Sequence, residues 1–243
     1  MKIKQLEIFG DLALLARSPL FGDNLTNRKT KPYHAITNGL IYVEFVVLPL
    51  EPVETGKGSL TRTMQKCCSM SCRFLPKAIK PALYKGFSGV CNQSRAVNNW
   101  TSQIERLKSS DKLMSLDTDQ VKIETRLTSF GDIGRLNDQG LDHIHEIIKV
   151  SSRHHAYSAS WRDPRLSLFA GLVQASVGLL SEAIEAYDLG FMPYGLSKED
   201  NLKFRLLTGR PAYACPYTVD TVKGCTLCAL SCDGSRAISL NNH

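Results

Sequence analysis

Hydrophobic and polar positions follow the periods of strands and helices in turn through the second half of the chain. Four short stretches are rich in the β-branched and aromatic residues typical of strands: residues 121–128, 155–161, 171–177 and 191–196. Apolar positions recur at helical spacing in residues 141–150 and 180–189. Strands that alternate with helices indicate parallel strands joined by helical crossovers. We therefore expect an α/β fold with a mainly parallel sheet, either open or closed into a partial barrel.

The first half of the chain is less regular. The pattern predicts an exposed loop over residues 22–39, a strand over residues 40–48, and a helix with a polar outer face over residues 98–114. We expect one compact domain with three parts: an N-terminal loop and strand (1–54), a basic cysteine-containing segment (55–120), and an α/β region that ends in a four-cysteine cluster (121–243). Functional groups are expected where strands end, at residues 128–135, at 161–165 and after 196.

The apolar stretches do not have the form of a secretion signal or a membrane span. Glu7 and Asp11 interrupt the apolar residues 6–16, and residues 166–180 contain polar side chains and are fewer than the 18 that a spanning helix needs. We expect a protein that stays inside the cell, with no membrane partner. Its eight cysteines are then expected to be reduced, and clustered thiols in such a compartment favour metal binding.

The C-terminal cysteines have the spacing of a metal site, C-x9-C-x2-C-x3-C, formed by Cys215, Cys225, Cys228 and Cys232. Thiolates two residues apart can converge on one cation, and two more complete a tetrahedron. Four soft ligands suit zinc and an iron–sulfur cluster equally. Partly buried thiols without a metal are the structural alternative.

The remaining cysteines are less regularly spaced: Cys67, Cys68, Cys72 and Cys91. They are candidates for a second metal site or for ligands of one shared centre. The Cys68–Cys72 spacing is distantly similar to the three-cysteine motif of radical S-adenosylmethionine enzymes. That motif would need a further cysteine at position 75, which is Leu75. An iron–sulfur enzyme of the radical type is therefore one alternative function.

The net charge of +7 comes entirely from one segment. Residues 55–104 contain eight basic side chains and no Asp or Glu, which leaves 22 basic and 23 acidic residues elsewhere. Aromatic rings lie between the charges, and cations with flat rings are typical of a groove for single-stranded nucleic acid. A solvated basic loop is the alternative. The candidate nucleic-acid-binding residues are Lys57, Arg62, Lys66, Arg73, Lys77, Lys80, Tyr84, Lys85, Phe87, Arg95 and Trp100.

A second pair of motifs suggests a nuclease. His143 and His145 match the His-apolar-His signature of HUH endonucleases, and Tyr194 with Lys198 matches their Tyr-x3-Lys motif. There the histidines would hold a divalent metal ion and Tyr194 would attack the phosphate. Residues 141–150 are expected to be helical, however, and positions i and i+2 of a helix point in different directions.

A third candidate lies just past the strand that ends near residue 128. Asp132 is placed to act as a general base or to contact a ligand. An Asp that forms a turn before a helix is the structural alternative. Arg126 lies nearby, and His154 and His155 precede the next polar and aromatic segment; single histidines of this kind are more often structural.

The order of several segments resembles the gene-product-88 family of bacteriophages and related mobile elements. The resemblance is carried by Asn-Arg-Lys-Thr-Lys from Asn27, by residues 39–45, 67–72 and 89–96, by Arg-Leu-Thr-Ser-Phe-Gly-Asp-Ile from Arg126, and by His-Ala-Tyr-Ser-Ala-Ser-Trp from His155. It implies an α/β protein with cysteine-rich ends, encoded by a phage or plasmid and acting in the cytoplasm of a bacterial host. It implies no particular activity, and it speaks against the HUH alternative.

Three functions therefore follow as hypotheses. The first is a metal-binding protein, with zinc or an iron–sulfur cluster, that binds nucleic acid, in particular single-stranded DNA, during replication or maintenance of a mobile element. The second is an HUH-type rolling-circle replication initiator with a Tyr nucleophile. The third is an iron–sulfur enzyme of the radical type. The sequence leaves open whether the protein is an enzyme.

Overall fold

The computed structural model describes residues 2–18, 21, 36–37, 40–50, 104, 107–108, 113–115, 122–216, 218 and 232–240. Nearly all of the basic segment 55–104 and most of the predicted loop 22–39 and helix 98–114 lie outside these residues. The end of that predicted helix is described, and there the prediction is wrong: β6 (Leu113–Ser115) is a strand that pairs antiparallel with β1 (Lys2–Lys4).

The apolar residues 6–16 form a β-hairpin. β2 (Leu6–Phe9) and β3 (Leu12–Arg17) pair antiparallel around a turn at Gly10 and Asp11. Gly10 has a φ of 69°, a left-handed conformation that glycine adopts without a Cβ clash. Asp11 therefore occupies a turn, and this explains why the apolar stretch is interrupted there.

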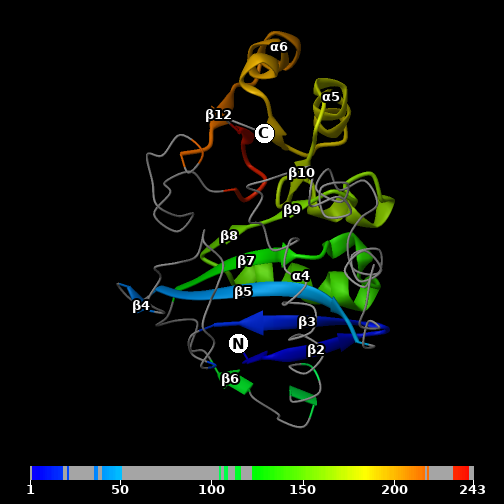
Figure 1. Cartoon of the computed structure of the whole chain (residues 1–243), viewed down its shortest axis with the longest axis vertical. Helices are drawn as coiled ribbons and strands as arrows, with labels where there is room; N and C mark the ends of the chain where they lie inside the picture. Colours follow the sequence, from blue (N-terminus) through cyan, green and yellow to red (C-terminus); the bar gives the residue numbers. More distant parts are fainter. Residues whose placement is uncertain are drawn as a thin grey trace, which may run out of the picture.

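The first sheet has the order β2-β3-β5-β7-β8 (Figure 1). Its central strands are long: β5 (Leu40–Pro49) and β7 (Lys122–Phe130) run parallel, and β8 (Arg153–His155) pairs parallel with β7. β3 and the short β4 (Ile36–Thr37) pair antiparallel with β5. The predicted strands 40–48 and 121–128 are thus confirmed, within a sheet that is mixed.

The second sheet is parallel throughout and has the order β9-β10-β11-β13-β12. It contains five short strands, which are β9 (Tyr157–Ser158), β10 (Gln174–Ser176), β11 (Pro193–Leu196), β12 (Ala212–Ala214) and β13 (Ala237–Ser239). The described strands do not form a closed barrel.

Ala156 separates β8 from β9, so one chain segment joins the two sheets. Its amide donates to the carbonyl oxygen of Cys232, and its carbonyl oxygen accepts from the amide of Gln174. The single strand predicted at 155–161 is therefore wrong in its extent. The chain pairs with β7 before Ala156 and with β10 after it.

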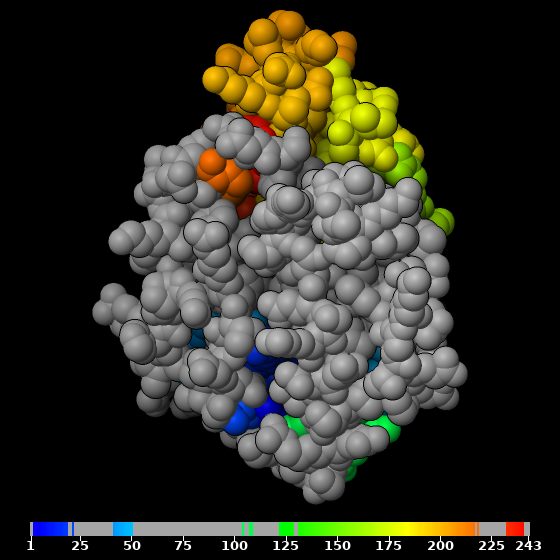
Figure 2. Space-filling view, viewed as in Figure 1, coloured from blue at the N-terminus to red at the C-terminus, as the bar shows by residue number. Residues whose placement is uncertain are grey.

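Three α-helices follow the strands of the second half. The helices predicted at 141–150 and 180–189 are confirmed as α4 (Asp138–Val150) and α5 (Leu180–Asp188). α6 (Lys198–Thr208) was not predicted. Two short 3-10 helices also occur, η4 (Ile133–Arg135) and η5 (Pro164–Phe169). α5 and α6 form one end of the molecule (Figures 1 and 2). Among the described helices none is long and apolar enough to cross a membrane.

The order of the parallel strands determines which face of the sheet the helices cover. From β7 through β8–β9 and β10 to β11, strands that follow one another in the chain are spatial neighbours and the direction never reverses. Because crossovers between parallel strands are right-handed, connections that progress in one direction all lie on the same face. α4 accordingly packs behind β7 in the view of Figure 1. One continuous hydrophobic core, extending in sequence from Ile3 to Ala237, joins the two sheets and their helices.

The opposite face of the sheet is polar where β5, β7 and β8 meet. The hydroxyl of Thr125 bonds to that of Ser151, which caps α4, so alternate residues from Ile123 to Leu127 face the helix. Glu124 and Arg126 face the other way. We call this side the polar face and define it by Tyr42, Glu44, Glu124, Arg126 and His155.

Candidate functional site on the polar face

Register places the polar side chains in two adjacent rows across three strands. Glu44, Arg126 and His155 are paired in one row, and Tyr42, Glu124 and Arg153 in the other. Side chains on neighbouring parallel strands in register lie beside one another. The exposed fractions are 1% for Glu44, 0% for Glu124, 6% for Arg126 and 1% for His155.

A short hydrogen bond links two of these side chains. His155 Nε2 lies 2.8 Å from Glu124 Oε1. When the carboxylate of Glu124 accepts this hydrogen bond, Nε2 carries the proton and Nδ1 presents a lone pair. Burial lowers the pKa of His155, and the hydrogen bond and charge of Glu124 offset that effect in part. The ring is therefore neutral at neutral pH and is held in one orientation by Glu124.

Burying four ionisable side chains in one patch is energetically unfavourable. An apolar patch of the same volume is often as stable as a buried ion pair, or more stable. Strand positions that face a core are filled mostly by Val, Ile and Leu in the rest of this sheet. Buried ionisable groups in this number are typical of sites that bind or transform a ligand.

Backbone strain marks the same region. Thr128, near the C-terminal end of β7, has a φ of 50°, which a β-branched residue rarely adopts. Its side chain is buried, and its hydroxyl donates to the carbonyl oxygen of Tyr157 at 3.3 Å. Such strain persists only where the surroundings enforce it, and it is concentrated at functional sites.

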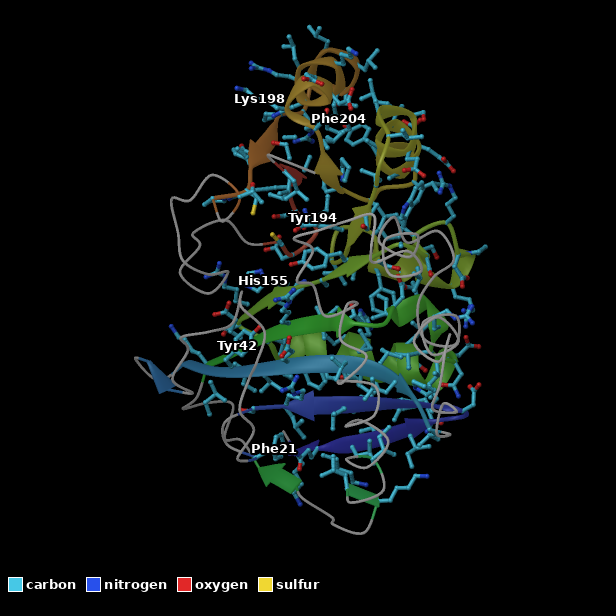
Figure 3. The ribbon with its side chains drawn as sticks, in the orientation of Figure 1. Phe21, Tyr42, His155, Tyr194, Lys198 and Phe204 are labelled. Carbon is cyan, nitrogen blue, oxygen red and sulfur yellow. The ribbon has the colours of Figure 1, made fainter. Side chains whose placement is uncertain are left out.

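The polar face continues into the second sheet. Tyr157 is two residues beyond His155 and shares its face, and Tyr157 is in register with Gln174. Tyr194, on β11, follows in register with Ser176, and its ring lies 4.4 Å from that of Tyr157 between centroids. Figure 3 shows Tyr42 on β5, His155 on β8 and Tyr194 on β11 one above another; β7 lies between the first two strands and β10 precedes the third.

Two of the four C-terminal cysteines also reach this face. Cys215 directly follows β12, its amide donates to the carbonyl oxygen of Ser239, and Cys232 lies against Ala156. Both side chains are buried in a small cluster with Tyr194, Ile238 and Leu240, and Tyr157 packs against it. The fold thus brings together two cysteines that are 17 residues apart in sequence.

Cys215 and Cys232 lie beside the last two strands of the second sheet. After β11 the chain passes to β12 at the sheet edge, and β13 pairs with β12 on one side and with β11 on the other. Cys215 directly follows β12, and the described residues that precede β13 begin at Cys232.

Cys225 and Cys228 lie outside the described residues, as do Cys67, Cys68, Cys72 and Cys91. Within the described part of the chain, no three His, Cys, Asp or Glu side chains are placed to hold a metal ion. Cys215 and Cys232 are thus two candidate ligands whose predicted partners are not described. All the candidate nucleic-acid-binding residues, from Lys57 to Trp100, also lie outside the description.

Asp132 serves as a structural acceptor. It caps η4 by accepting from the amide of Gly134, and it also accepts from the hydroxyl of Ser158 and the amide of Ala159. Its side chain is buried. Three protein donors hold this carboxylate, as expected for the structural alternative, and they tie the end of β7 to the end of β9.

The two HUH histidines do not converge. Both lie on α4, where His143 contacts the ring of Phe9 and His145 contacts that of Phe169. Tyr194 is buried in β11, and Lys198 is exposed in the first turn of α6, apart from Tyr194 (Figure 3). The described geometry therefore does not assemble the two motifs into one site.

Sequence reasoning missed Glu44 and Glu124 and treated His155 as structural. One signal was present in the sequence: Glu44 is a charged residue within an otherwise apolar strand, and Glu124 and Arg126 alternate with apolar residues. Alternation indicates two faces, but by itself it assigns the charged one to solvent. That this face is buried follows only from the structure.

No family model, curated protein or solved structure matches this chain.

Proposed function

We propose that this protein is a metal-binding protein whose C-terminal cysteines hold zinc or an iron–sulfur cluster on the polar face of the sheet. The observation that carries the proposal is the burial of Cys215 and Cys232 in one cluster. Thiolates are the form that binds metal, and a buried negative thiolate is stabilised by a cation. The aromatic and aliphatic neighbours of the two cysteines would exclude water from such a centre.

Replacement of Cys215 and Cys232 by Ser tests this part. The double variant should lose the metal that the purified protein carries, and a Ser158→Ala variant, whose changed side chain lies on the opposite face, should keep it. Equal metal content in wild type and double variant would refute the assignment.

We further propose that the basic segment 55–104 binds nucleic acid, in particular single-stranded DNA. Its support is the charge distribution: eight basic residues without an acidic one, interleaved with aromatic residues. The resemblance to the gene-product-88 family supports a role in the replication or maintenance of a phage or plasmid within a bacterial cytoplasm.

Salt dependence measures this interaction directly. Replacing Lys77, Lys80 and Lys85 by Ala should weaken binding to a single-stranded oligonucleotide and reduce the salt slope by about 2. The matched control replaces Lys4, Lys149 and Lys203, which are exposed elsewhere on the fold. A wild-type protein without salt-sensitive binding would contradict the proposal.

An iron–sulfur enzyme is the second candidate, and one observation favours it. The buried Glu44, Glu124, Arg126 and His155 form an environment in which acid–base chemistry can occur. Anaerobically purified protein should then be brown, with charge-transfer absorbance. A colourless sample with stoichiometric zinc would exclude the iron–sulfur enzyme. The metal-binding protein that binds nucleic acid would then remain as the proposed function.

A further inference from the structure

Three buried acceptor atoms on the polar face and its continuation have no hydrogen-bond partner among the described residues. They are Oε2 of Glu124, Nδ1 of His155 and Oε1 of Gln174. They come from β7 and β8 of the first sheet and from β10 of the second sheet, which pairs with β9. Gln174 belongs to the same side because it is in register with Tyr157, which shares the face of His155.

Each of these atoms is held in place by the other end of its own side chain. Glu124 Oε1 and His155 Nε2 bond to each other at 2.8 Å. The amide nitrogen of Gln174 donates to the carbonyl oxygen of Arg236 at 2.7 Å. The acceptors therefore have fixed positions, as is typical of a binding site formed before its ligand arrives.

The three atoms require the same kind of partner. A buried acceptor without a donor destabilises the fold, so three such atoms on one side of the sheet are unfavourable unless a donor occupies the site. A ligand that satisfies them carries several N–H groups. Arg126 and Arg153 share these two rows with Glu44 and Glu124, so the formal charges around the imidazole balance. A neutral donor group adds no further charge to this buried patch, whereas an ammonium would.

Aromatic rings border the same acceptors. Tyr157 lies between His155 and Gln174 on this face, and its ring contacts that of Tyr194. Flat side chains beside fixed acceptors are suited to a planar heterocycle, because its ring can stack while its edge donates hydrogen bonds.

We propose that the polar face binds a nucleobase that carries an exocyclic amine, with the amine and ring N–H groups donating to Glu124, His155 and Gln174. The inference rests on the proposed function, since a nucleic-acid strand supplies such bases. It adds a base-recognising site on the sheet that is separate from the basic segment.

Calorimetric titration of the full chain with single nucleosides tests the site. The probes are adenosine, cytidine and guanosine, each compared with the analogue whose exocyclic amine is N,N-dimethylated. At least one parent nucleoside should bind, and its dimethylated analogue, which keeps the ring but lacks the amine donors, should bind about tenfold more weakly or worse. Binding by none of the three, or equal binding of each pair, would overturn the proposal and leave buried water as the partner of these acceptors.

Variants connect the result to the named atoms. Glu124→Gln and Gln174→Met should each weaken binding of the parent nucleoside by about tenfold. Glu146→Gln, on the exposed side of α4, should leave this affinity unchanged. Folding of each variant is checked by circular dichroism. In the wild type, the ¹⁵N signal of His155 Nδ1 should shift when nucleoside is added, which tests the site without any substitution; an unchanged signal at saturation contradicts it.

The basic-segment variant separates the two proposals. Lys77, Lys80 and Lys85 replaced together should weaken strand binding but leave nucleoside affinity unchanged. Failure of strand binding alone therefore counts against the basic segment, and failure of nucleoside binding alone counts against the polar face.

Discussion

Asp132 and Glu124 are both buried carboxylates, but their surroundings differ. Asp132 accepts from two backbone amides and a hydroxyl, whereas Glu124 bonds to His155 through one oxygen and its other oxygen has no partner among the described residues. A fully satisfied carboxylate stabilises the fold, and an incompletely satisfied one is more consistent with a functional role.

Replacing Asp132 by Asn should therefore destabilise the protein. The amide group of Asn puts a donor where Oδ1 or Oδ2 now accepts, and loss of a hydrogen bond to a charged group leaves a buried donor unsatisfied. We expect a loss of about 2–4 kcal/mol in the free energy of unfolding, measured in urea. Asp142→Asn, on the exposed side of α4, is the control and should change it by less than about 0.5 kcal/mol.

His155 should make stability depend on pH. Burial lowers its pKa in the folded protein, so below the unfolded value of about 6.5 the unfolded chain binds the proton more readily. The contribution of His155 to the free energy of unfolding is therefore complete above about pH 6.5. It is lost as the pH falls towards the pKa of His155 in the folded protein, by up to about 1.4 kcal/mol per pH unit.

Urea unfolding across this range, in wild type and in His155→Gln, measures the effect. Burial also lowers the pKa of His143, so the informative quantity is the difference between the two proteins. The variant should show a shallower loss of stability in acid. If the free energy of unfolding changed equally with pH in both proteins, His155 would not titrate as its burial requires.

At the scale of elements, α6 ends at a glycine for a clear reason. Gly209 has a φ of 71° and its amide donates to the carbonyl oxygen of Arg205, which is the left-handed helix end that glycine favours. No atom lies within 4 Å of where a Cβ would stand, so space does not limit substitution there.

Gly209→Ala should cost about 1 kcal/mol of stability through backbone conformation alone. Gly178→Ala is the comparison, because Gly178 does not have a positive φ and a Cβ there would be at ordinary contact distance, 3.6 Å, from Glu182. Thermal unfolding of both variants measures the difference. Equal melting temperatures would show that the left-handed conformation of residue 209 contributes nothing.

The sequence predicted elements wherever burial follows one period. α4 buries Leu141, Ile144 and Ile148 at helical spacing, β5 has the apolar content of a buried strand, and β7 alternates between its two faces. α6 buries only Phe204 among its described side chains, and three of its leucines are exposed (Leu202, Leu206 and Leu207), so its apolar residues do not mark one face. β12 and β13 have three residues each, too few to show a period.

At the scale of the whole molecule, the candidate site depends on strand order and register. The four ionisable residues of the polar face, Glu44, Glu124, Arg126 and His155, come from three separate strands, and only pairing places them side by side. Sequence spacing did single out Cys215 and Cys232, because thiol clusters keep their pattern in one short segment. It could not indicate that the fold buries these two cysteines in one cluster with Tyr194.

The metal centre proposed for Cys215 and Cys232 would also act on the stability of the whole molecule. A bound structural metal can contribute on the order of 10 kcal/mol to folding, so its removal by a chelator should also lower the melting temperature.

Elemental analysis of the purified full chain is the most direct test. We expect stoichiometric zinc or iron in the wild type and its loss in the Cys215→Ser, Cys232→Ser double variant. A folded wild-type protein that contains neither metal would show that these cysteines do not form a metal centre.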